Sequence, residues 1–215
     1  MTVICSSSNP HQLRSKLGAF DPTSVRGIIS FGVAGGLDPE LATGDIVVAT
    51  EVVMEDQRWE TAAGLSSELI GTVGEGGRKL ARGIITGSEI VVPCPSEKAK
   101  LRQRTDAAAV DMESHIAAGF ALASGLPFAA LRVISDPASR ALPAIATQAL
   151  KENGNVDLLK VLRAIAREPS VIPHLMRTGR DFNRAIMTLR GCRRLLLGEG
   201  GSLGGGSGSL VTADL

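Results

Sequence analysis

The chain has 215 residues, of which 44% are hydrophobic and 21% charged, and its formal net charge is +1. This length allows one α/β domain with a substantial core, while the near-neutral charge gives no reason to expect a nucleic-acid partner. Three cysteines and three histidines lack metal-ligand or redox spacing, and no stretch is apolar for long enough to cross a bilayer, so we expect a cytoplasmic protein without a bound metal.

Short β-branched runs alternate with helical segments up to residue 136. This alternation predicts an α/β fold with a mixed central sheet flanked by helices. We expect strands at 3–5, 25–31, 46–53, 69–73, 83–86, 109–112 and 128–134, and helices at 10–17, 96–104 and 113–124.

The last third of the chain changes character. Residues 156–167 and 171–194 show helical apolar spacing, and residues 160–194 carry nine Lys or Arg against two acidic residues. This basic helical segment has three interpretations: an ordinary solvated face, the docking site of an acidic partner, or a surface that meets anionic lipid at the inner face of a membrane. We expect residues 1–195 to form one domain and the Gly/Ser-rich residues 198–215 to be a disordered tail.

A glycine-rich segment, Gly32-Val33-Ala34-Gly35-Gly36, follows the strand expected at 25–31. Such a segment is either a tight structural turn or a place where backbone N–H groups approach a ligand closely. It matches neither a Walker phosphate loop nor a dinucleotide-binding fingerprint.

Two carboxylates stand at the ends of predicted strands. Asp136 closes the apolar run 127–134, and Glu113 lies where the strand 109–112 gives way to a helix. Open α/β sheets bind ligands outside the carboxyl ends of their strands, which favours a functional role. The alternative is that each carboxylate caps a helix, Glu113 the helix that follows it and Asp136 one that starts at Pro137. As functional groups, Glu113 would accept hydrogen bonds from vicinal hydroxyls and Asp136 would be a general acid.

Four segments, in this order and spacing, carry a resemblance to a known family: 32–37, 44–48, 110–114 and 132–136, or GVAGGL, GDIVV, VDMES and RVISD. Over about residues 25–140 the chain resembles the nucleoside phosphorylase and methylthioadenosine/S-adenosylhomocysteine nucleosidase superfamily. Within it, the sequences DMESH and DPA and the basic helical segment are most similar to the hopanoid-associated phosphorylases.

The resemblance implies a role for each matching residue. Asp136, positioned by Ser135, would protonate the purine N7, and Glu113 would bind the ribose hydroxyls with Met112 packed on the sugar. Substrate contacts would also come from Ala34, Gly35, Ile90, Val91 and Val110. Phosphate contacts would come from Ser6, Ser7, Ser8, Ser30 and the Gly32 N–H.

The implied reaction is phosphorolysis of a 5′-substituted adenosine, preferentially adenosylhopane, with release of adenine. Inorganic phosphate would be the co-substrate, no organic cofactor would be needed, and the protein would be a homo-oligomer. The alternatives are hydrolysis of methylthioadenosine or S-adenosylhomocysteine, and nucleoside binding without catalysis.

Two departures from the family pattern bear on these alternatives. The chain opens at what resembles the second or third strand of the family fold, so we expect the first strand, with its glycine-bearing loop, to be lacking. Ser88 also stands where nucleosidases usually have an aspartate after Gly87.

Overall fold

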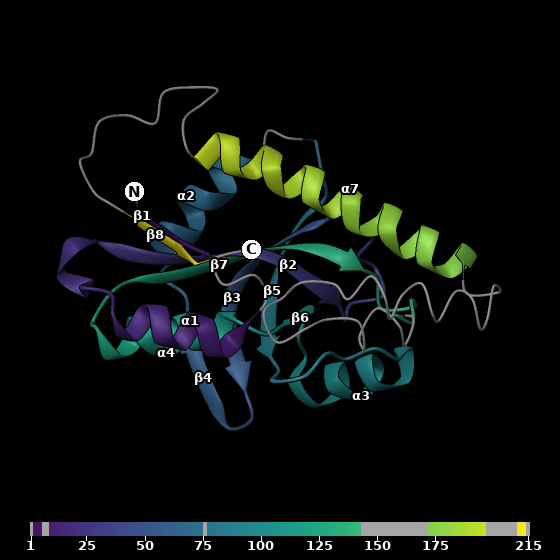
Figure 1. Ribbon diagram of the computed structural model, residues 1–215, viewed down its shortest axis with the longest axis horizontal. Coiled ribbons are helices and arrows are strands. Elements are labelled where there is room, and N and C mark those ends of the chain that lie inside the picture. Colours follow the sequence, from purple (N-terminus) through teal and green to yellow (C-terminus); the bar gives the residue numbers. More distant parts are fainter. Residues whose placement is uncertain (1, 6–8, 75–76, 143–171, 197–209, 214–215) are drawn as a thin grey trace.

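One mixed sheet with helices on both faces organises the computed structural model, which describes residues 2–5, 9–74, 77–142, 172–196 and 210–213 (Figure 1). The strands are β1 (Thr2–Ile4), β2 (Gly27–Gly36), β3 (Ile46–Met54), β4 (Gln57–Glu60), β5 (Leu80–Gly87), β6 (Ala109–Asp111), β7 (Phe128–Asp136) and β8 (Leu210–Ala213). The helices are α1 (Pro10–Gly18), a 3₁₀ turn (Pro22–Ser24), α2 (Ala63–Val73), α3 (Pro95–Thr105), α4 (Ser114–Ala123) and α7 (Ile172–Leu196). The predicted mixed sheet flanked by helices is therefore confirmed.

Strand β7 lies at the centre of the sheet, parallel to β2 and antiparallel to β3. Its side chains alternate between the two faces, as the period of a strand requires. Ala129, Leu131 and Val133 join the cluster that contacts α2 and α7, whereas Ala130 and Ile134 join the cluster that contacts α4. Because both faces are covered, β7 is apolar on both sides apart from Arg132, which explains its nearly continuous hydrophobic run.

Strand β2 is longer than predicted. It continues through the glycine-rich segment to Gly36, because β7 pairs with it as far as Asp136, with one shift of register between Ala34 and Gly35. Of its two interpretations, the tight turn is thus not supported, because the segment is part of the sheet.

One local prediction is wrong, and one strand was not predicted. Residues 69–73 belong to helix α2, because Leu65, Leu69 and Val73 recur every four residues and pack on one side of the sheet. Strand β4 was not predicted; it pairs with β3 through the two-residue turn Glu55–Asp56. Glu55 has a φ of 53° there, without the glycine or asparagine that marks most such turns.

The predicted disordered tail needs a correction at its end. Leu210–Ala213 forms β8, which lies parallel to and between β1 and β2. Val211 and Thr212 are β-branched, which favours a strand, and the ladders on both sides supply backbone hydrogen bonds. The rest of that tail and the predicted helix 156–167 lie outside the described residues. The helix predicted at 171–194 is confirmed from Ile172 onward as α7.

Candidate active site

Three strands bring Asp136, Gly35 and Val110 together. Gly35 pairs with Asp136 of β7 on one side and with Val110 of β6 on the other. A β-carbon on Gly35 would lie 3.3 Å from both Asp136 Oδ2 and Val110 Cγ1. Because glycine has no β-carbon, the Asp136 carboxyl can lie close against β2, at the end of the sheet where β7 stops.

Asp136 is held from two sides. Ser135 Oγ donates to Asp136 Oδ1 at 2.6 Å and also lies 3.1 Å from the Ala34 carbonyl oxygen. On the other side, Lys98 Nζ of α3 forms an ion pair with Asp136 Oδ2 at 2.5 Å. No helix follows Asp136 within residues 137–142, so the helix-capping alternative for this carboxylate is not supported.

Glu113 stands at the start of α4 but does not cap it, since its side chain makes no capping hydrogen bond. Asp111 does so instead: the Ser114 N–H donates to both of its carboxylate oxygens at 3.2 Å. Glu113 Oε1 is buried without a hydrogen-bond partner. Burial, aided by the charge of Asp111 and opposed by that of Arg132, raises the pKa of Glu113 to about 7. Glu113 is thus a buried acceptor with an open position for a donor.

A buried ionic network lies next to Glu113. Arg132 of β7 forms an ion pair with Asp111, and each side chain is only 1% exposed. Arg132 also donates from Nη2 to Ser30 Oγ at 2.7 Å, and Ser114 Oγ donates to the Asp111 carboxylate. An arginine inside an otherwise apolar strand was the available sequence signal for this network, although its partners lie far away along the chain.

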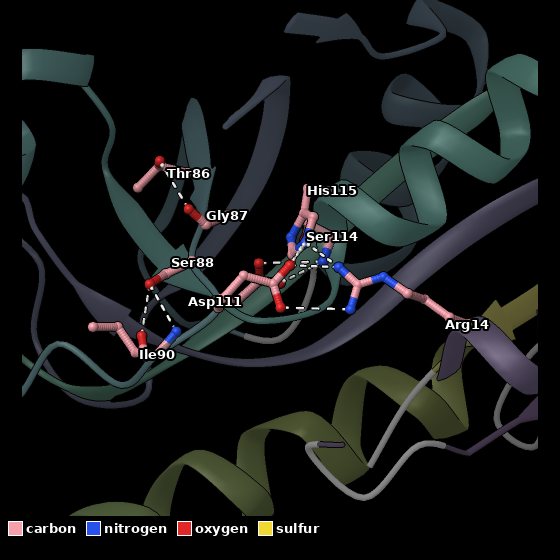
Figure 2. A network of polar contacts seen from close by, with 9 residues as sticks. Arg14, Thr86, Gly87, Ser88, Ile90, Asp111, Ser114 and His115 are labelled. Atoms are coloured by element: carbon pink, nitrogen blue, oxygen red, sulfur yellow. Dashed lines mark hydrogen bonds and ion pairs between the residues drawn. The ribbon is translucent and has the colours of Figure 1, made fainter. Parts of the chain in front are cut away.

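A second polar cluster lies beside this network and joins α1, α4 and the segment after β5 (Figure 2). Arg14 of α1 forms an ion pair with Glu89, and His115 Nε2 lies 3.2 Å from Glu89 Oε1. Arg14 lowers the pKa of Glu89, and burial lowers the pKa of His115. His115 Nδ1 is buried without a partner, close against Gly87. These contacts tie helix α1 to the start of α4.

The remaining predicted substrate residues differ in their surroundings. Ala34 and Val110 are buried, Met112 and Val91 are partly exposed, and Ile90 is 74% exposed. A hydrogen bond of 2.6 Å from Ser88 Oγ to the Ile90 carbonyl shapes the turn that carries Ile90 (Figure 2). The structure thus gathers Ala34, Gly35, Val110, Ser135 and Asp136, whereas Ile90 lies on the surface.

Of the predicted phosphate contacts, Ser6, Ser7 and Ser8 lie outside the described residues. Gly32 is buried within β2. Ser30 is 0% exposed and already bonded to Arg132, which favours a structural role for it over a phosphate contact.

Two further observations concern metal ligands and cavities near this region. Among the described residues, no group of three or more His, Cys, Asp or Glu side chains could hold a metal ion. A groove of about 550 Å³ lies beside α3, lined in part by Leu37, Arg102 and Ala138 and by neither candidate carboxylate.

Comparison with known proteins gives one family and several similar folds. The family model described as the phosphorylase superfamily matches residues 15–167. The chain is similar to the 5′-methylthioadenosine/S-adenosylhomocysteine nucleosidase of Helicobacter pylori, with a TM-score of 0.62 and 19% identity over 89% of this chain and 77% of that one. The nucleosidase of Campylobacter jejuni gives a TM-score of 0.57 and 22% identity over 71% and 73% of the two chains.

A third similar structure is the futalosine hydrolase of Helicobacter pylori, with a TM-score of 0.56 and 24% identity over 62% of this chain. The match spans 65% of that hydrolase, slightly less than two-thirds of its length. At these identities the similar structures establish the fold, and the family model establishes the superfamily.

Proposed function

The chain belongs to the phosphorylase superfamily, and we propose that it cleaves the N-glycosidic bond of a 5′-substituted adenosine and releases adenine. The observation that carries this proposal is Oε1 of Glu113, a buried oxygen without a hydrogen-bond partner, in a partly buried side chain that does not cap its helix. A buried acceptor without a donor is costly, and the hydroxyls of a bound ribose are donors of the required kind.

Asp136 supplies the second half of the proposed chemistry. As the C1′–N9 bond breaks, its electron pair leaves with the purine, and the carboxyl of Asp136 protonates N7. The ribosyl group then carries positive charge, and a nucleophile attacks C1′. Holding the sugar through Glu113 and neutralising the departing base through Asp136 both favour this transition state.

We propose phosphate as the nucleophile, with a 1-phosphorylated ribosyl product. Water is the second candidate, because the similar solved structures are named as nucleosidases and hydrolases. Nucleoside binding without catalysis is the third candidate.

We further propose that the 5′ substituent is large and apolar, with adenosylhopane as the preferred substrate, and that α7 docks on an anionic membrane surface. Four of the seven large apolar side chains that are exposed among the described residues lie on α7. Helix α7 also carries exposed arginines, while its single acid, Asp181, forms an ion pair with Arg140. Exposed apolar groups among arginines match the chemistry of an interfacial helix, which suits a substrate that partitions into lipid. In the described residues, no helix is long and apolar enough to cross a bilayer.

Flotation with vesicles tests the membrane proposal. We expect the protein to float with vesicles rich in anionic lipid at low salt and not with neutral vesicles. The double variant Met176→Gln/Met187→Gln should float less, whereas Leu122→Gln, which alters an even more exposed apolar side chain on α4, should behave as the wild type. Equal binding by both variants, or no binding by the wild type, would reject this surface.

One assay tests the proposed reaction. The protein is incubated with methylthioadenosine or with adenosylhopane, each with and without phosphate, and the products are identified by mass spectrometry. Adenine with a ribosyl 1-phosphate supports phosphorolysis, whereas adenine with a free ribosyl product supports hydrolysis. Binding of either nucleoside without release of adenine would assign the chain to the non-catalytic alternative.

A further inference from the structure

Lys98 is a buried cation on a helix that is otherwise polar and largely exposed. Its side chain is 0% exposed, although its neighbours Glu97, Ala99 and Lys100 on α3 are exposed. The ammonium donates to Asp136 Oδ2 at 2.5 Å and lies 3.1 Å from the Pro137 carbonyl oxygen. The carbonyl oxygens of Asp136 and Arg140, each at 3.4 Å, complete its surroundings.

We propose that Lys98 is a positioning residue for the leaving-group step. This inference rests on the proposed function and assigns a group, on a separate helix, that acts through the acid Asp136. Every acceptor around the ammonium belongs to residues 136–140, so one cation fixes both the carboxyl of Asp136 and the backbone that follows it.

An ordinary structural ion pair on the same helix gives a contrast. Arg102, one turn after Lys98, pairs with Asp38, and the two side chains are 31% and 27% exposed. That pair is open to water, where such contacts contribute little. Lys98 instead faces an acid whose side chain is 11% exposed and which stands at the end of the central strand. A fixed charge in such a site acts strongly on any charge that develops beside it.

The proposed step conserves atoms and charge. Asp136, a carboxylate in its ion pair with Lys98, first takes a proton from water. It then passes this proton to N7 while the electron pair of the broken C1′–N9 bond goes to the purine. The carboxyl becomes a carboxylate, and its new negative charge lies against the Lys98 ammonium, which keeps all three of its protons. Ser135 Oγ can accept from the protonated acid and donate to the Ala34 carbonyl. After adenine leaves, Asp136 regains a proton from water.

The experiment compares two leaving groups. Methylthioadenosine needs a proton on its base, whereas N7-methylated methylthioadenosine already carries a positive charge on the base and leaves without one. For Lys98→Met we expect kcat with methylthioadenosine to fall about 100-fold or more, as when one preorganised donor to a developing charge is removed. With the N7-methylated substrate the fall should be less than about tenfold, because that base requires no proton.

Two further variants separate charge from folding. Lys98→Gln keeps hydrogen-bond donors for the carbonyl oxygens but removes the charge, so it should show the same leaving-group dependence with a smaller loss of stability. Lys100→Met, an exposed lysine on the same helix, should match the wild type on both substrates.

The outcomes are distinct. Equal losses on both substrates, wild-type rates in both Lys98 variants, or failure of both variants to fold would overturn the positioning role alone. Absence of adenine release by the wild type, from methylthioadenosine and adenosylhopane alike, would overturn the proposed function and this inference together.

Discussion

Arg132 and Asp111 form an ion pair inside the protein, with each side chain 1% exposed. Arg132 comes from the central strand β7, and Asp111 comes from the end of β6. Asp111 also caps α4 through the Ser114 N–H, so the pair connects the sheet to the helix that starts beside Glu113. Because removing one partner of such a pair leaves an uncompensated buried charge, this contact sets the stability of the candidate site.

Replacing Arg132 by Met should therefore lower the free energy of unfolding by about 3–5 kcal/mol, the usual cost of breaking a buried pair. Arg14→Met is the matched control, because the Arg14 and Glu89 side chains are 42% and 45% exposed. Arg14→Met should lower the free energy of unfolding by less than about 1 kcal/mol, as for exposed ion pairs. Urea unfolding of the two variants measures both values, and similar losses in both would contradict the assigned difference in burial.

Stability should also depend on pH through Glu113. The pKa of Glu113 is raised from its ordinary 4.5 to about 7, so between these values the folded protein binds more protons than the unfolded chain. The contribution of Glu113 to the free energy of unfolding is fully present below pH 4.5 and is lost as the pH rises through 7. The loss is about 3 kcal/mol at 1.36 kcal/mol per pKa unit.

Glu113→Gln should remove this dependence. We expect the difference in unfolding free energy between wild type and Glu113→Gln to change across pH 4.5–7 and to be constant outside that range. A difference that is flat over the whole range would show that Glu113 has an ordinary pKa. Glu113→Gln should also weaken nucleoside binding, since the amide offers one acceptor oxygen where the carboxylate offers two.

Gly87 allows the close approach of His115. A β-carbon at position 87 would lie 2.5 Å from His115 Nδ1 and 2.8 Å from its Cβ, so one of the two residues must shift. Gly87→Ala should destabilise the protein by about 1–3 kcal/mol, a typical cost of overpacking. The double variant Gly87→Ala/His115→Ala should recover much of that loss. Gly71→Ala serves as the control, because its β-carbon meets nothing within 4 Å in helix α2, and it should stabilise by up to about 1 kcal/mol.

The sequence predicted those parts of the fold that depend on local pattern. The runs 46–53 and 128–134 are β3 and β7, and the periodic segments 10–17 and 113–124 are α1 and α4. These elements were predictable because an element that buries one or both faces has a regular spacing of apolar residues. Strand β4 has no comparable sequence signal, since the turn through Glu55 that precedes it lacks a typical turn residue and depends on pairing with β3.

The candidate site was predicted less completely. Asp136, Glu113 and Gly35 were identifiable from strand ends and from a family resemblance. Lys98 was not, because its partner lies 38 residues away along the chain and meets it only in the folded protein. Arg132 is conspicuous inside an apolar strand, but its partner Asp111, 21 residues away, could not be predicted from the sequence. A lysine within a polar helix is normally solvated, so nothing local distinguishes Lys98 from Lys100.

Asp136→Asn gives the most direct test of the assigned acid. Asparagine keeps an oxygen that can accept from Lys98, but it cannot transfer a proton, so adenine release should fall by a factor of about 10²–10⁴, the usual contribution of a general acid. Nucleoside binding, measured by calorimetry, should change little. Asp106→Asn is the matched control: Asp106 is exposed and has a φ of 54° at the end of α3, a conformation that asparagine also tolerates. Unchanged turnover in Asp136→Asn, with normal folding, would mean that another group protonates the base.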